Sequence, residues 1–206
     1  MNLKLTTLTV GSIGTNCYII YKEDTKAAVV IDPSDDATLV QARIDALGLK
    51  VLAILLTHGH FDHGGDVKRL LKKQKAPVYL QEADRKLPSW LTHLLLGTST
   101  DSYAEGDVLD FEGLRFTVLQ TPGHTPGSVC LLCGDMLFAG DTLFAGSCGR
   151  TDLPGGSWKD MAASLCRLAS LEGDYKVFPG HGEATTLDEE RGSNPYMEMA
   201  LREKKQ

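Results

Sequence analysis

The chain has 206 residues, of which 42% are hydrophobic and 23% are charged, and its formal net charge is −6 at pH 7. This length and composition are typical of a globular protein that buries a sizeable core. The negative charge argues against a broad surface for nucleic acid or anionic membranes. No repeat or Pro/Gly/Ser-rich linker divides the sequence, so we expect a single domain over residues 1–206.

The N-terminal residues and the cysteines both favour a cytoplasmic protein. The N-terminus alternates apolar and polar residues and lacks the basic start and continuous apolar stretch of a signal peptide. No apolar run approaches the roughly 20 residues that span a bilayer. The five cysteines cannot all pair within one chain. We therefore expect reduced thiols in a cytoplasmic location.

Residue patterns in the first part of the chain predict strands, followed by alternating helices and strands. The spacing of Val40, Ile44 and Leu47 predicts a helix over residues 35–47 that stops at Gly48, and a second helix is expected over 66–75. Alternating or continuous apolar runs between turn residues predict the strands. The expected strands cover residues 3–10, 16–21, 26–31, 51–57 and 77–80.

The second half repeats this mixture of elements. An apolar helix is expected over residues 89–96, and a longer one over 157–171 with Ser157 as its N-cap. A C-terminal helix should begin at about Leu187. Two packed mixed sheets covered by helices would accommodate both halves. The expected strands are 107–111 and 114–120 as one hairpin, 128–132 and 136–139 as another, and 175–178.

The segment LLTHGHFDHGGD follows the apolar run of residues 51–56 and places His58, His60, Asp62 and His63 directly after a buried strand. Such polar groups are costly to desolvate unless a hydrogen-bond network, a charge relay or a metal ion pairs with them. In an extended segment residues i and i+2 lie on one side, so His58 and His60 can bind one ion together. Imidazoles and carboxylates suit zinc, iron or manganese.

Four further polar residues also follow apolar strands: Asp32, His124 in TPGHTPGS, Asp141 and His181 in PGHGE. Loops at strand ends are where active sites collect. A single histidine would more often cap a helix or join a hydrogen-bond network, but that explanation does not account for the whole set. The candidate metal ligands are too many for one tetrahedral ion and suit two ions that share a carboxylate. They are His58, His60, Asp62, His63, His124, Asp141 and His181.

These motifs together resemble the metallo-β-lactamase superfamily, and within it the hydroxyacylglutathione hydrolase (glyoxalase II)-like branch. The resemblance extends from Asp32 through THGHFDHGGD, TPGHTPGS and FAGD to FPGH. It implies an α/β fold, a four-layer αβ/βα sandwich of two mixed β-sheets flanked by helices. The metal site would lie at one edge, between the two sheets.

The resemblance also implies a role for each ligand. His58, His60 and His124 would bind one metal ion, Asp62, His63 and His181 the other, and Asp141 both. Asp32 would support the loop that carries His58. The implied cofactors are two divalent metal ions, zinc first, with iron or manganese as alternatives.

Two departures from family patterns narrow the expected activity. The best-known subclass of true β-lactamases is exported and has cysteine at the position of Asp141, which argues against drug hydrolysis. Full-length glyoxalase II enzymes carry an extra C-terminal helical domain, whereas only 25 residues follow His181 here. The resemblance therefore favours the compact, single-domain relatives.

The segment GRTDLPGG resembles a substrate-contacting loop of glyoxalase II-like enzymes and also a stretch in persulfide dioxygenases. Arg150 is its candidate substrate-binding residue, because a guanidinium can bind a carboxylate through two hydrogen bonds. The alternative is an internal ion pair with Asp152 or another carboxylate. We interpret Cys148 as a packing or pocket-wall residue, and His93 as a half-buried helix residue or part of the pocket rim.

The expected function is hydrolysis of small thioesters or related acyl compounds by a metal-bridging hydroxide, with Asp62 as the catalytic residue that orients it. The main alternative is a persulfide dioxygenase with one iron bound by His58, His124 and Asp141. A nuclease or a non-enzymatic metal-binding protein fits the charge and the ligand number less well. The expected partner is a small-molecule acyl or thioester substrate, with no nucleic acid and no membrane, and the oligomeric state is left open.

Overall fold

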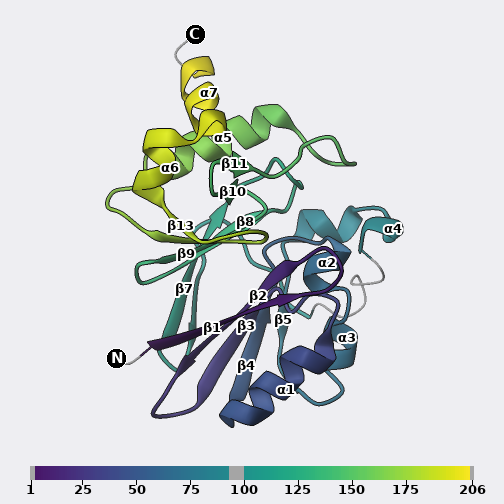
Figure 1. Cartoon of the computed structure of the whole chain (residues 1–206). Helices are drawn as coiled ribbons and strands as arrows, with labels where there is room; N and C mark the ends of the chain where they lie inside the picture. The colour runs from purple at the N-terminus through teal and green to yellow at the C-terminus, as the bar shows by residue number, and fades with distance from the viewer. Residues whose placement is uncertain (1–2, 93–99, 205–206) are drawn as a thin grey trace.

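In the computed structural model, which describes residues 3–92 and 100–204, two β-sheets face each other and helices cover their outer faces (Figure 1). The strands of the first sheet are, in spatial order, β1 (Leu3–Val10), β2 (Thr15–Lys22), β3 (Ala27–Ile31), β4 (Lys50–Leu55) and β5 (Val78–Tyr79). The sheet is mixed, because β1, β2 and β3 pair antiparallel whereas β3, β4 and β5 pair parallel.

The second sheet is formed by the second half of the chain. Its strands are, in spatial order, β13 (Thr185–Thr186), β12 (Lys176–Pro179), β9 (Met136–Gly140), β8 (Val129–Cys133), β7 (Leu114–Gln120) and β6 (Val108–Phe111). It is also mixed, since β12 runs parallel to β9 while the other neighbours are antiparallel. A separate two-stranded sheet pairs β10 (Leu143–Phe144) with β11 (Ser147–Cys148).

The helices are distributed over both outer faces. The first half contains α1 (Ala37–Leu47), α2 (Phe61–Gly64), α3 (Val67–Leu70), the 3-10 helix η1 (Glu82–Lys86) and α4 (Ser89–Thr92). The second half contains α5 (Trp158–Ala169), α6 (Leu187–Ser193) and α7 (Pro195–Glu203). Figure 1 shows α1 and α3 beside the first sheet and α5, α6 and α7 above the second.

Alternating side chains build a hydrophobic core between each pair of layers. In β3, Val29 and Ile31 point between the sheets, where they pack with Phe116 and Phe138 of the other sheet. Val30, which points the opposite way, joins the core beneath α1 and α3. A third core joins the second sheet to α5, α6 and α7. Three cores separate four layers, and the predicted αβ/βα sandwich is thereby confirmed.

The helix prediction over residues 66–75 was wrong in its extent, and the C-terminal helix, which begins at Leu187 as expected, is divided in two. The helix expected over residues 66–75 is reduced to α3, followed by turns. The side chain of Asp66 accepts a hydrogen bond from the backbone of Ala37 and forms no cap on α3 itself. Lys68 and Lys72, four residues apart, would also repel each other in a longer helix. The C-terminal helix divides into α6 and α7 because Pro195 cannot continue α6.

The other predicted helices and the predicted strands agree with the structure except at their ends. Gly48 ends α1 in a left-handed conformation (φ 62°), as expected, and the side chain of Ser157 caps α5. The helix expected over residues 89–96 is represented by α4, while its remainder and His93 lie outside the described residues. Within residues 3–92 and 100–204, no helix has the length and apolar character required to cross a bilayer.

Candidate metal centre

Five strands of the two sheets end at the same edge, and each delivers polar side chains there. Asp32 follows β3, and His58, His60, Asp62 and His63 follow β4. In the second sheet β8 runs antiparallel to both β7 and β9, and β12 runs parallel to β9. The strands β7, β9 and β12 therefore point in the same direction. Their carboxyl ends carry the remaining predicted ligands, which are His124, Asp141 and His181.

His58, His60 and His124 form one group of converging nitrogens. His60 Nδ1 lies 3.2 Å from His58 Nε2 and 2.9 Å from His124 Nε2. All three side chains are buried. Two nitrogens bound to one zinc ion at about 2.0–2.1 Å in a tetrahedral arrangement lie about 3.3–3.4 Å apart. The group therefore has the spacing of three ligands of a single ion.

The outer ring nitrogens of two of these histidines fix which nitrogen faces the centre. His124 Nδ1 lies 2.7 Å from the backbone oxygen of Arg150, which can only accept a hydrogen bond. His58 Nδ1 lies 3.2 Å from the hydroxyl of Thr57, whose proton is donated to Asp32. Each Nδ1 is therefore the donor, and each Nε2 presents a lone pair inward.

Asp62, His63 and His181 form a second group. His181 Nε2 lies 3.2 Å from Asp62 Oδ2, and His63 Nε2 lies 3.5 Å from the same oxygen. His63 is fully buried, while the side chain of His181 is 23% exposed and that of Asp62 14%. These three side chains provide a mixed nitrogen and oxygen ligand set with one side open to solvent.

Asp141 lies between the two groups. Its Oδ2 is 3.5 Å from His124 Nε2 and 3.6 Å from His181 Nε2, and its Oδ1 is 3.3 Å from His63 Nε2. One carboxylate thus faces a histidine of the first group and two of the second. This is the position that a ligand shared by two ions requires.

The cluster satisfies two tests for metal ligation. The buried Nε2 of His63 and Oδ1 of Asp141 have no hydrogen-bond partner among the described residues, which is costly unless another group binds them. Burial and the neighbouring imidazoles lower the pKa of His58 and bring the pKa of His60 to about 4. These two histidines are therefore neutral at pH 7, the form in which imidazole binds a metal.

The two carboxylates are also in the form that binds metals. Burial alone would raise the pKa of Asp141 and of Asp62, but the nearby His63 and His181 reverse its effect and lower both. In return, Asp141 and Asp32 raise the pKa of His63 despite its burial. A divalent cation would take the place of the proton that this arrangement holds on His63.

Asp32 supports the centre more directly than predicted. Its side chain accepts hydrogen bonds from the backbone and hydroxyl of Thr57, which precedes His58, as expected. In addition, Asp32 Oδ2 lies 2.9 Å from His63 Nδ1 and orients that ring. Asp32 adopts a left-handed backbone conformation (φ 47°), which turns its side chain back toward the end of β4.

Two buried polar residues that the sequence analysis did not identify support the ligand loops. The side chain of Asn16 donates hydrogen bonds to the backbone oxygens of Pro179 and Gly182, on either side of the His181 loop. The side chain of Asp84, in η1, accepts hydrogen bonds from the backbone of the loop of His58 and His60 and from the loop of His124. The sequence alone does not show that Asn16 is buried, so its role could be recognised only from the structure. Asp84 was missed because the sequence analysis predicted no helix at η1.

A cavity of about 610 Å³ opens onto the cluster. Cys148 and Arg150 line it, together with ligands of both groups. Burial raises the pKa of Cys148 to about 11, so its thiol is a poor nucleophile at neutral pH. Arg150 forms two hydrogen bonds of 2.7 and 2.8 Å with Asp152, the ion pair that was the alternative to substrate binding. Both side chains remain more than 60% exposed.

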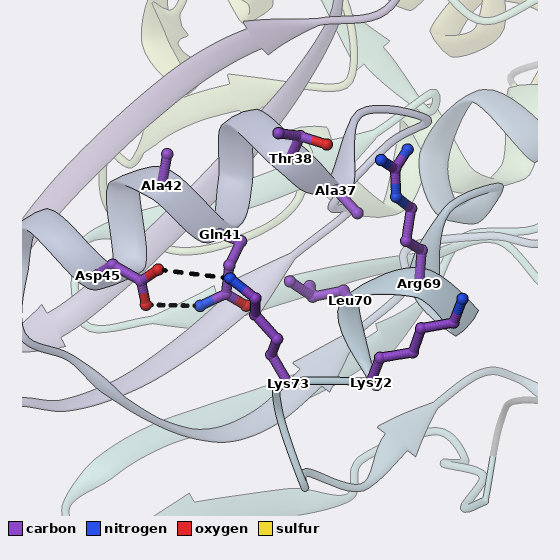
Figure 2. A pocket seen from close by; sticks show the side chains of 9 residues that line it. All are labelled: Ala37, Thr38, Gln41, Ala42, Asp45, Arg69, Leu70, Lys72 and Lys73. Atoms are coloured by element: carbon purple, nitrogen blue, oxygen red, sulfur yellow. Dashed lines mark hydrogen bonds and ion pairs between the residues drawn. The ribbon is translucent and has the colours of Figure 1, made fainter.

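A second hollow, of about 410 Å³, lies between α1 and α3 (Figure 2). There the carboxylate of Asp45 accepts a hydrogen bond of 2.7 Å from Gln41 and lies 3.9 Å from the ammonium group of Lys73. Figure 2 shows that side chains of α1, of α3 and of the turn after α3 line it and that none of the predicted metal ligands is among them. Its residues supply no histidine or cysteine, so the candidate centre is the cavity at the strand ends.

The sequence profile of the metallo-beta-lactamase superfamily matches residues 10–181, and the chain belongs to this superfamily. Hydroxyacylglutathione hydrolase GloC of Haemophilus influenzae is 34% identical to this chain. The alignment, 214 residues long, covers 96% of this chain and 98% of that protein. The predicted family is thereby confirmed. Membership places the chain in a family of metal-dependent enzymes, consistent with the His/Asp cluster.

Solved structures show the same fold. BLEG-1, described as a B3 metallo-beta-lactamase, has a TM-score of 0.86 at 36% identity and covers 94% of this chain and 99% of its own. TTHA1623 in a di-iron-bound form has a TM-score of 0.80 at 39% identity, covering 93% and 99%. ETHE1 from Myxococcus xanthus has a TM-score of 0.82 at 28% identity, covering 96% and 90%.

Proposed function

We propose that this chain hydrolyses small thioesters, in the manner of glyoxalase II, with two divalent metal ions held by the His/Asp cluster. The observation that carries the proposal is the position of Asp141, whose two oxygens face ligands of both groups within 3.6 Å. The 34% identity to GloC over 96% of the chain supports the thioester as substrate class.

The proposed ligands are those that the sequence analysis assigned. His58, His60 and His124 hold one ion, Asp62, His63 and His181 the other, and Asp141 both. Zinc suits these nitrogen and oxygen donors, and the di-iron form of TTHA1623 supports iron as an alternative. Bound divalent ions would supply a hydroxide at neutral pH and stabilise the oxyanion of the reacting carbonyl.

Asp62 is the proposed catalytic residue. Its Oδ2 is 3.3 Å from the hydroxyl of Thr15 and 3.2 Å from His181 Nε2, so the carboxylate is held in place at the floor of the cavity. There it orients the attacking oxygen and accepts its proton as the new carbon–oxygen bond forms. The carbon–sulfur bond then breaks, and because a thiolate leaves without prior protonation, no separate general acid is needed.

The walls of the cavity suit a small acyl compound. Ile13, Leu91, Phe144 and Leu153 line it with apolar surface, and Ile13 is 55% exposed at the turn between β1 and β2. Arg150 provides a cation on the same wall. An acyl group of modest size with an anionic substituent matches this combination of apolar contacts and a single guanidinium.

The experiment is a substrate panel for the purified chain, accompanied by elemental analysis. We expect hydrolysis of thioesters that strong chelators abolish and that zinc, manganese or iron restores. The panel includes lactones, phosphodiesters and, because of the likeness to BLEG-1, a β-lactam. A thioester activity that resists chelators and depends on Cys148 would point to a covalent mechanism and overturn the proposal.

Persulfide oxidation at a single iron, bound by His58, His124 and Asp141, is the second candidate. The GRTDLPGG segment, which resembles a stretch in persulfide dioxygenases, favours it, whereas the complete second group of ligands favours the hydrolase. Oxygen uptake with a persulfide and one iron per chain would support oxidation. Two ions per chain and no oxygen uptake would support thioester hydrolysis.

A further inference from the structure

Asp84 is a buried carboxylate that lies close to the metal centre without facing it. Its side chain is fully shielded from solvent, and it belongs to η1, a short 3-10 helix between β5 and α4. Among the described residues, no lysine or arginine forms an ion pair with it. A buried charge with no cationic partner is costly, so it has to be stabilised by hydrogen bonds.

Those hydrogen bonds come from the two loops that carry the first group of ligands. Asp84 Oδ2 accepts from the backbone N–H of Gly59 at 2.7 Å and from the hydroxyl of Thr125 at 2.8 Å. Oδ1 accepts from the backbone N–H of Gly127 at 2.6 Å. Gly59 stands between His58 and His60, and Thr125 follows His124 directly.

The packing around Asp84 explains why both loops have glycine there. A Cβ atom at Gly59 would lie 3.0 Å from the Cβ of Asp84, and one at Gly127 would lie 2.6 Å from its Oδ1. Neither glycine has a positive φ, so neither is required by its backbone conformation. Close approach of the backbone to the carboxylate is the reason that remains.

We propose that Asp84 is a positioning residue that fixes the loops of His58, His60 and His124 relative to each other and thereby sets the affinity of the ion those three histidines bind. It acts through backbone and threonine donors, and none of its hydrogen bonds among the described residues goes to the side chain of a proposed ligand. The second group has different supports, because Asp32 bonds to His63 and Asn16 bonds to the loop of His181. The effect of Asp84 should therefore be selective for one ion.

The test is the substitution Asp84→Asn, which preserves size and removes the charge. Whichever way the amide faces, its NH₂ group meets an N–H or O–H donor, so at least one of the three hydrogen bonds is lost. We expect the ion held by His58, His60 and His124 to bind about 10- to 100-fold more weakly, the usual effect of removing a group that orients metal ligands. The second ion should retain its affinity within about twofold.

The measurement is a titration of the metal-free protein with Zn²⁺ in competition with a chromogenic chelator. Parallel titration with Co²⁺ reports the coordination of each ion by its absorption spectrum. Glu190→Gln is the matched control, because Glu190 is also a buried carboxylate with three hydrogen bonds, from Gly146, Thr185 and Asn194. It should reduce stability while leaving both metal affinities unchanged.

A milder variant keeps the test decisive if Asp84→Asn does not fold. Thr125→Val removes the hydroxyl that donates to Asp84 and should weaken the same ion by about 10-fold, the scale of one hydrogen bond to a charged group. Unchanged affinities in a folded variant, equal weakening of both ions, or equal weakening in Glu190→Gln would each contradict the proposal.

This inference rests on the dinuclear site of the proposed function. The titration measures metal affinity and requires no substrate. If the chain binds two ions but hydrolyses no thioester, the proposed reaction fails and the role of Asp84 is still decided by the titration. If Asp84→Asn leaves both affinities unchanged while thioesters are hydrolysed, only the inference about Asp84 fails.

Discussion

His60 Nδ1 lies 2.9 Å from His124 Nε2, although 64 residues separate the two histidines in the sequence. His124 Nε2 presents a lone pair, because its Nδ1 donates to the backbone oxygen of Arg150. A second lone pair on His60 Nδ1 would repel it at this distance unless a cation lies between them. The two nitrogens therefore share either the proton of His60 in the metal-free chain or, as proposed, an ion held between the ends of β4 and β7.

The first prediction concerns the number of ions and the role of Asp141. The purified chain should contain close to two transition-metal ions, because its ligands form two groups that meet at this carboxylate. In Asp141→Ala both ions should bind more weakly, since each loses an oxygen ligand. Elemental analysis after dialysis against a weak chelator measures this directly.

Asp135→Ala is a suitable control for that experiment. Asp135 lies in the turn between β8 and β9 and pairs with Lys176 at 2.9 Å, on an exposed surface. Its removal should leave the metal content unchanged. Retention of both ions in Asp141→Ala would exclude a shared carboxylate.

The second prediction separates catalysis from metal binding at Asp62. Asp62→Asn should reduce kcat by about 10²- to 10⁴-fold, the usual contribution of a positioned proton acceptor. The ion bound by His58, His60 and His124 should be retained, because Asp62 belongs to the other group. His58→Ala should instead lose activity together with metal. Parallel measurements of kcat and bound metal distinguish the two variants, and an Asp62→Asn protein with near-normal kcat would remove Asp62 from the reaction.

The layers of the fold could be predicted because local patterns specify them. The continuous apolar runs of β3 and β8 and the apolar face of α1 depend only on residues near each other in the sequence. The extent of α3 could not be predicted in this way, because the side chain of Asp66 accepts a hydrogen bond from Ala37 of α1 instead of capping its own helix. That hydrogen bond spans 29 residues and exists only in the folded chain.

The clustering of the proposed ligands could be predicted from the sequence, whereas most of the residues that support them could not. A histidine at a strand end is recognisable from its type and position, and the resemblance assigned each one to a group. Asn16 and Asp84 are ordinary polar residues until the fold buries them against loops that are distant in sequence. The role predicted for Arg150 stays a prediction, because the ion pair with Asp152 does not decide whether the side chain also binds a substrate.

The third prediction concerns the pH dependence of stability through Glu105. Hydrogen bonding from Arg167 lowers the pKa of Glu105, and Arg167 also donates to the backbone of Gln120 at the end of β7. A folded pKa below the unfolded value of about 4.3 means that the ion pair stabilises above that pH and loses its contribution as the pH falls through the folded pKa.

Glu105→Gln should therefore lower the unfolding free energy of the metal-free protein at pH 7 by at most about 1 kcal/mol, since both side chains are at least one-third exposed. At pH 3 the difference from the original chain should be smaller than at pH 7. Urea denaturation at both values of pH measures it. A difference of the same size at pH 3 would assign the effect to packing instead of charge.

The last prediction concerns specificity at Arg150. Its ion pair with Asp152 is exposed on both sides, and pairs of this kind contribute little to stability. Arg150 also lines the cavity, and its side chain is 61% exposed, so a substrate there can reach its charge. Arg150→Ala should raise KM for anionic thioesters by about 10- to 100-fold, the scale of a lost charge-assisted hydrogen bond. Neutral esters should be nearly unaffected, because they make no such contact.

Two further variants distinguish substrate binding from support of the loop, whose backbone oxygen at Arg150 accepts a hydrogen bond from His124. Arg150→Lys should restore only part of the affinity, because an ammonium group lacks the planar arrangement of donors. Asp152→Ala releases the guanidinium from its partner, so KM for anionic thioesters should stay the same or fall. If the pair instead holds the loop that orients His124, Arg150→Ala and Asp152→Ala should impair charged and neutral substrates equally. Kinetics of both substrate classes on these variants decide between the two, and equal impairment would remove Arg150 from the specificity residues.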